Sequence, residues 1–302
     1  MRKLLSIALI AGMVSPAPAL AKEPVRLRSS SKWLLNYADE SCRLARKFGE
    51  GDQQVTLFLD QLEPGDWFQI VFYGKPLRTL TRDAPRADLT FRFGPNEAAE
   101  DVDANAGTLA ELPAVLISGS HRIAPLTAAE KAVRDAAHER GEDFDPPTLG
   151  AEREKAASFL EISKGSRLDI VLETGPMSAP LTALRECAWD TIRSWGLNVE
   201  QQKTLSRKVA RTNPKKPWLT SRDYPTEMLR GGYEGVVNFR LLVDASGNPT
   251  SCHIQTSTRP KEFDDAVCRA VMKRVKFNPA LDAKGNPVPS YYRQTVNFRL
   301  AG

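Results

Sequence analysis

The stretch Gly232–Pro249, GYEGVVNFRLLVDASGNP, decides the fold of the C-terminal part of this chain. Every second residue at its centre is apolar: Val237, Phe239, Leu241 and Val243. A period of two is typical of a strand that buries one face, so Asn238 and Arg240 are expected to point outward. The turn formers DASGN (244–248) then predict a hairpin, with residues 249–257 returning as the partner strand.

The letters VNFRL recur at 296–300, where Val296, Phe298 and Leu300 again alternate with polar residues. The sequences that flank the two copies differ, so one sheet imposes the same alternation on two strands and no unit is duplicated. Between them, residues 259–274 place apolar side chains at helical spacing, and residues 226–232 predict a short helix that ends at two glycines. The expected order is helix, strand, strand, helix, strand.

Residues 222–300 resemble the TonB C-terminal domain family, because several motifs occur in the family's order and spacing. These are DYP (223–225), the stretch quoted above, FDDAVCRAVMKR (263–274), VKFNPALDAKGNPV (275–288) and TVNFRL (295–300). The resemblance implies a three-stranded antiparallel sheet packed on helices. It also implies a partner, since family members bind periplasmic segments of outer-membrane receptors in Gram-negative bacteria.

The N-terminus is predicted to be a secretory signal peptide over residues 1–21. Arg2 and Lys3 precede the apolar run 4–14, and Ala19-Leu20-Ala21 fits a signal-peptidase site. The run is shorter than the roughly 20 residues that span a bilayer. We therefore expect an exported, periplasmic protein; the alternative is an uncleaved signal anchor in the inner membrane.

Residues 22–200 are expected to form a mainly-β domain of unknown role that ends in a helix, which makes the whole chain α+β. Short apolar runs bounded by turn residues predict strands at 54–60, 66–74, 87–93, 113–123, 158–162 and 167–173. The acidic residues 94–110 are expected to form a surface loop. Helices are predicted at 126–141, with Thr127 as the cap, and at 178–196, where apolar residues recur every three or four positions.

Residues 201–221 carry many basic side chains and no acidic one, and are interpreted as a linker before the domain at 222–302. The segment 203–216 is a candidate for contact with an anionic membrane or wall; the alternative is a solvated connection. Few apolar residues anchor it, so it is expected to be the region most sensitive to proteases.

Four cysteines in an exported protein favour disulfides. Cys42 and Cys187 lie near the start and end of the first domain, and a bond between them would join these ends. The alternative is two buried thiols. Cys252 and Cys268 lie on a predicted strand and the helix that should cover it; a metal site is the alternative here, although three scattered ligands with His253 are a weak signature.

The leading functional hypothesis is a periplasmic TonB-like protein that binds extended segments of outer-membrane receptors or of other periplasmic proteins. The edge of the last strand is the expected site, and the resemblance adds the segment before the first short helix. The candidate partner-binding residues are Arg222, Asp223, Tyr224, Pro225, Arg293, Thr295, Asn297 and Arg299. A second copy at this edge, giving a homodimer, is the alternative occupant.

Other function classes receive less support from the sequence. A membrane-anchored TonB energy transducer would need the uncleaved anchor, and a periplasmic enzyme would need a catalytic centre within 22–200. We expect no catalytic residues, cofactor or metal. The net charge of +5 is mild, and together with export it argues against nucleic acid as a partner.

Overall fold

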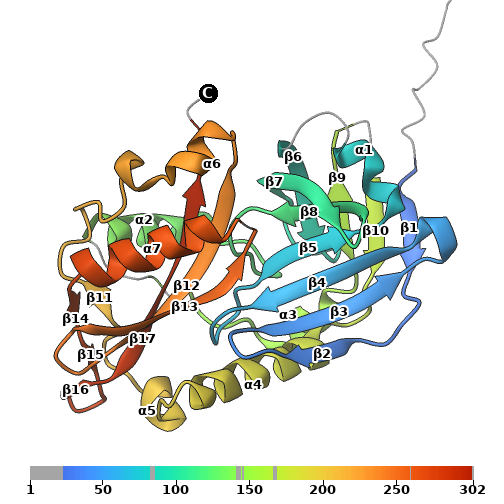
Figure 1. Cartoon of the computed structure of the whole chain (residues 1–302). Coiled ribbons are helices and arrows are strands. Elements are labelled where there is room, and N and C mark those ends of the chain that lie inside the picture. The colour runs from blue at the N-terminus through green and yellow to red at the C-terminus, as the bar shows by residue number, and fades with distance from the viewer. Residues whose placement is uncertain are drawn as a thin grey trace, which may run out of the picture.

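The structure of the protein is a computed structural model that describes residues 23–81, 86–140, 144, 146–165, 169–258 and 260–300. The expected signal peptide, residues 1–21, lies outside the described residues. Two sheets with separate cores occupy opposite sides of the molecule (Figure 1). Residues 23–200 are here called the first domain and residues 205–300 the second domain.

The first domain is built on a ten-stranded sheet in the order β1-β10-β9-β6-β7-β8-β5-β4-β3-β2. Its strands are β1 (Val25–Arg28), β2 (Leu34–Tyr37), β3 (Cys42–Phe48), β4 (Val55–Gln61), β5 (Gln69–Tyr73), β6 (Arg86–Phe93), β7 (Glu100–Leu109), β8 (Leu112–Ile117), β9 (Leu160–Ser163) and β10 (Asp169–Glu173). Neighbouring strands are antiparallel except for β1 and β10. On β4, Val55, Leu57 and Leu59 are fully buried in the core, and Phe58 between them is half-buried on the other face.

The two ends of this sheet are joined, so that it curls around its core. Beyond β1, Ser29 forms a bridge with Phe48 at the end of β3. The N–H of Ser30 donates to the carbonyl of Lys47 at 2.9 Å, and the N–H of Gly49 donates to the carbonyl of Arg28 at 2.8 Å. This closure encloses the apolar residues of both ends in one core.

Helix α1 (Arg78–Thr81) packs on β6, β7 and β8, and α4 (Ser178–Ser194) packs on β3 and on α3 (Ala151–Ala156). Helix α2 (Ala128–Arg140) is drawn behind α7 (Lys261–Arg274) in Figure 1, and α5 (Val199–Lys203) follows α4 toward the second domain. The apolar stripe of α4 is buried as its spacing predicts, with Leu181 and Leu184 in the core. Its Cys187 is bonded to Cys42 of β3, which ties the end of the domain to its start as expected. Thr127 caps α2 by exchanging hydrogen bonds with Glu130.

Two expectations for the first domain differ from the structure. Residues 94–110 do not form only a surface loop, because β7 runs through Glu100–Leu109 between β6 and β8. Its sequence is polar and contains few core residues, so the strand is held by pairing on both sides and local pattern gives no signal. Strands β1 to β3 also lie where the sequence predicted no element.

The second domain has the expected order and a three-stranded antiparallel sheet, β13-β12-β17. Its elements are β11 (Ala210–Arg211), α6 (Thr226–Arg230), β12 (Gly235–Val243), β13 (Pro249–Ser257), α7 (Lys261–Arg274), β14 (Phe277–Asn278), β15 (Ala280–Leu281), β16 (Pro287–Val288) and β17 (Ser290–Phe298). Phe239 of β12, Phe263 of α7 and Phe298 of β17 share one core on the α7 side. Cys252 is bonded to Cys268 of α7, the second expected disulfide.

The basic segment 201–221 is not the poorly anchored linker that the sequence suggested. Val209 and Trp218 are buried in the core of the second domain, and the Trp218 ring lies 5.6 Å from that of Phe239. Strand β11 pairs with β14, and the N–H of Ser206 donates to the carbonyl of Leu281 at 2.9 Å. The segment is therefore a packed part of the second domain, and its exposed basic side chains project from that surface. Among the described helices, none combines the length and the apolar character that crossing a membrane requires.

Candidate functional site

Strand β17 forms an edge of the second-domain sheet. In the part of the chain that the structure describes, it pairs only with β12, through an unbroken antiparallel register from Gly235 opposite Phe298 to Val243 opposite Ser290. An edge strand presents a row of backbone N–H and C=O groups that a further strand can use. The geometry therefore offers one open hydrogen-bonding edge along β17.

The register also shows which residues point their backbone groups at this edge. Along a strand, these groups point alternately to one neighbour and to the other. The backbone groups of Val236 point toward β13, because its N–H donates to Thr258 Oγ1 at 2.8 Å and its C=O accepts from the Thr258 N–H at 3.0 Å. Asn297 stands opposite Val236, so its N–H and C=O point away from β12. Because this direction repeats every two residues, the backbone N–H and C=O groups of Thr295 and Arg293 also point away from β12.

The side chains of the four candidate residues on β17 and just past its end fall into two pairs. Arg293 lies 3.2 Å from Glu63 of the first domain, and Thr295 Oγ1 donates to Asn238 Oδ1 at 2.6 Å. Asn297 and Arg299 are exposed. This differs from the expectation that all four side chains are available to a partner, because Glu63 of the first domain engages Arg293 and Asn238 of β12 engages Thr295.

The segment Arg222–Pro225 lies beside the end of β17. The Tyr224 ring contacts those of Phe298 and Phe263 edge-on, at 5.5 and 5.4 Å, and its hydroxyl donates to the carbonyl of Tyr233. Pro225 precedes the first turn of α6, while Arg222 is exposed. The fold thus brings this flank and the last residues of the edge strand together.

An ion pair fixes this flank. Arg274 at the end of α7 donates to the Asp223 carboxylate at 2.7 Å, and the N–H of Thr220 donates to the same carboxylate at 2.8 Å. The hydrogen bond from Arg274 holds the pKa of Asp223 well below its usual range. Asp223 is therefore ionised at neutral pH, and the stabilisation from this pair is lost only as the pH falls toward that lowered pKa.

The face of the sheet opposite α7 is covered by the first domain. Arg240 is only 2% exposed; its guanidinium donates to both oxygens of Glu40, at 2.6 and 2.8 Å, and lies 4.1 Å over the Trp195 ring. On β13, the Gln255 side chain donates to the carbonyls of Glu40 and Leu62.

On β12, Asn238 accepts from Gln69 at 3.2 Å and is also buried. Asn238 and Arg240 do point away from α7 as expected, but they meet the first domain and not solvent. The expectation that this face is outward is wrong for that reason.

Comparison with known proteins agrees with this geometry. Residues 220–300 match the family model described as Gram-negative bacterial TonB protein C-terminal. This segment is a TonB C-terminal domain. The match includes the flank Arg222–Pro225 and all of β12, β13, α7 and β17.

Two curated relatives match the same region. Protein tonB2 of Pseudomonas aeruginosa is 41% identical over 58 residues, which are 19% of this chain and 21% of that protein. Protein TonB of Xanthomonas campestris pv. campestris (strain B100) is 36% identical over 77 residues, which are 26% of this chain and 34% of that protein. The chain therefore spans about a third or less of these relatives.

Sequence reasoning missed the residues of the first domain that border the TonB C-terminal domain. Glu40, Glu63 and Gln69 contact Arg240, Arg293 and Asn238 across separations of 200, 230 and 169 residues. No local pattern reports such a contact, and Glu40 carried no signal beyond its place two residues before Cys42. The covered face of the TonB C-terminal domain could be found only in three dimensions.

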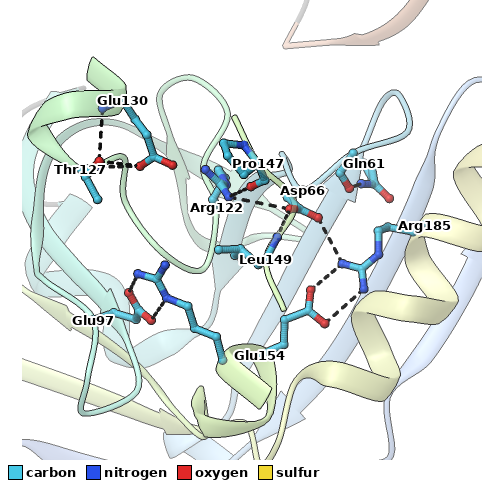
Figure 2. Close-up of polar contacts among 12 residues, drawn as sticks. Gln61, Asp66, Glu97, Arg122, Thr127, Glu130, Pro147, Leu149, Glu154 and Arg185 are labelled. Atoms are coloured by element: carbon cyan, nitrogen blue, oxygen red, sulfur yellow. Dashed lines mark hydrogen bonds and ion pairs between the residues drawn. The ribbon is translucent and has the colours of Figure 1, made fainter. Parts of the chain in front are cut away.

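A second polar cluster lies inside the first domain (Figure 2). Arg185 of α4 donates to Glu154 of α3 at 2.6 Å and to Asp66 at 3.2 Å, and Arg122 lies 3.8 Å from the other Asp66 oxygen. The hydrogen bond with Glu154 raises the pKa of Arg185 against the effect of burial. Each of these charges has an opposite charge beside it, which is the arrangement of a structural network. The cluster therefore adds no support for a catalytic centre in this domain.

Proposed function

We propose that this protein is a periplasmic binding protein whose TonB C-terminal domain takes up an extended segment of an outer-membrane receptor. The segment adds as a fourth strand along β17. The observation that carries the proposal is the open edge of β17, where Arg293, Thr295 and Asn297 direct their backbone groups outward. Main-chain hydrogen bonds supply the affinity in this mode of recognition, and neighbouring side chains supply the specificity.

Specificity is expected to come from the two exposed side chains, Asn297 and Arg299, and from the flank Arg222–Pro225. Arg293 and Thr295 contribute backbone groups, since their side chains are engaged by Glu63 and Asn238. The first domain covers most of the face of the second-domain sheet opposite α7, so the edge of that sheet remains open to a partner. Binding is thus proposed without a catalytic step.

Asn297→Pro is expected to weaken binding of a synthetic peptide from the periplasmic segment of a TonB-dependent receptor at least tenfold. A tenfold loss corresponds to about 1.4 kcal/mol. Proline removes the outward N–H, and its ring occupies the space of the incoming strand. Isothermal titration calorimetry of the mature chain measures the effect.

Asn297→Ala is the matched control, because it removes the side chain but keeps the N–H, and it should weaken binding no more than about threefold by loss of one side-chain hydrogen bond. Equal affinities for the proline and alanine variants, with unchanged circular dichroism, would exclude the edge as the site. A concentration-dependent dimer that Asn297→Pro dissociates would identify a second copy as the occupant.

The proposed location predicts that the mature protein begins at Lys22. Cleavage after Ala21 would release the chain into the periplasm, where receptor segments are accessible. N-terminal sequencing of protein purified from the cell envelope checks this. An intact Met1 region would instead support an anchored energy transducer, with the same edge binding the receptor and the first domain held close to the inner membrane.

A further inference from the structure

Three half-buried apolar side chains form a row on the outer face of the first-domain sheet. Phe58 of β4 stands opposite Val71 of β5, and Val71 stands opposite Leu116 of β8. Their neighbours along each strand are fully buried in the core, so the row points away from that core. The outer face of an antiparallel sheet is normally polar where it meets water. An apolar row at this position indicates a surface suited to contact with another chain.

Aromatic and charged contacts hold one end of this row in place. The Arg43 guanidinium lies 4.2 Å over the Phe58 ring, and its ion pair with Asp60, at 2.6 Å, fixes it there. The Tyr73 ring lies 5.4 Å from the Phe58 ring. Because its side chains are already positioned, the row loses little conformational freedom when a partner packs on it.

The TonB C-terminal domain faces this row across a cleft of about 1260 Å³. The opposite wall is formed by the start of β12 and the ends of β13 and β17, elements that lie beside β7 and β8 in Figure 1. It includes Val236, Asn238, Thr256, Thr258, Asn297 and Arg299. Small-molecule sites usually occupy roughly 300–1,000 Å³. From strand spacings, an extended chain fills on the order of 160 Å³ per residue, so the cleft has room for roughly eight residues of polypeptide.

We propose that the first domain forms the second wall of the peptide site, and that the bound segment packs alternate apolar side chains on Phe58, Val71 and Leu116. This inference rests on the strand addition proposed above. Its support is continuity, since Asn297 to Leu300, at the end of the open edge, line the same cleft as the apolar row. A strand added at β17 presents every second side chain on the face toward the first domain.

The occupant is therefore an extended peptide with apolar residues at alternate positions. Charged residues at those positions are disfavoured, because they would lose water against the apolar row, and the charges beside Phe58, Arg43 and Asp60, already pair with each other. The first domain thus selects among segments that share the same backbone pairing. The TonB C-terminal domain supplies affinity through the backbone, and the first domain adds selectivity for the side chains of the bound peptide.

Leu116→Arg in the full mature chain tests the inference. Two peptides serve as probes: the receptor-derived peptide, and a version of it whose alternate apolar residues are replaced by serine. We expect the variant to bind the receptor-derived peptide at least tenfold more weakly than wild type does, and we expect only wild type to prefer that peptide over the serine version. Val133→Arg is the matched control; Val133 is 57% exposed on α2, outside the residues that line the cleft, and should leave binding unchanged. If Leu116→Arg lowers the melting temperature, Leu116→Ser and Val71→Ser replace it.

The outcomes separate this inference from the proposal on which it rests. If wild type binds, Asn297→Pro abolishes binding and every variant of the row binds like wild type, the edge is the site and the second wall is disproved. If wild type binds neither peptide, strand addition itself fails. A photoreactive benzophenone residue at position 116 should also crosslink to the peptide, whereas one at position 133 should not. Crosslinking equal at both positions would overturn the inference.

Discussion

Arg185→Ala is expected to lower the free energy of unfolding by about 3–5 kcal/mol, the usual cost of removing one partner from a buried ion pair. Arg185 is the close partner of Glu154, whose side chain is 1% exposed, and it also contacts Asp66. Its removal leaves one buried carboxylate without a cation and the other with only Arg122, 3.8 Å away. Urea unfolding followed by far-ultraviolet circular dichroism measures the loss.

Arg193→Ala is the control on the same helix. Arg193 pairs with Asp190, but the two side chains are 66% and 50% exposed, and a surface pair of this kind contributes about 0–1 kcal/mol. The double variant Arg185→Met, Glu154→Met should recover most of the lost stability, because it leaves no unpaired charge. Equal losses from Arg185→Ala and Arg193→Ala would show that water solvates Glu154 and that the network contributes little.

Replacing Cys42 and Cys187 together by alanine is expected to cost up to about 5 kcal/mol, since the chain-entropy stabilisation of a disulfide grows with the loop it closes. These cysteines are separated by 145 residues, and both are fully buried where α4 packs on β3. Thermal or urea unfolding of the oxidised variant compared with wild type gives the difference.

The disulfide between Cys252 and Cys268 closes a much shorter loop, with a separation of 16 residues. Replacing these two cysteines by alanine should therefore lower the free energy of unfolding by roughly 3 kcal/mol. The first pair should therefore matter more than the second. A loss below about 1 kcal/mol for the Cys42 and Cys187 variant would mean that the unfolded chain is already compact across this span.

The proposed site was partly predictable. The alternation in Gly232–Pro249 placed β12, and the repeat of VNFRL placed β17, so a strand carrying Asn297, with Arg299 just past its end, followed from the sequence. That Arg293 is engaged by Glu63 of the first domain and Thr295 by Asn238 of β12 did not follow, because these partners lie 230 and 57 residues away in the chain. The apolar row of Phe58, Val71 and Leu116 was not predicted either, because apolar residues on the outer face of a strand look in the sequence like residues of a core strand.

The sequence alone determined the local elements of this protein: the strands with a period of two, the helices with a period near four, the DASGN turn and the stripe of α4. These depend on interactions between residues close in the chain, or on one periodic face. The tertiary structure alone decided that Glu100–Leu109 is a strand, that the basic segment is packed, and that Arg240 is buried on Glu40. Each of these depends on pairing or charge neutralisation by residues distant in sequence, which local propensity does not encode.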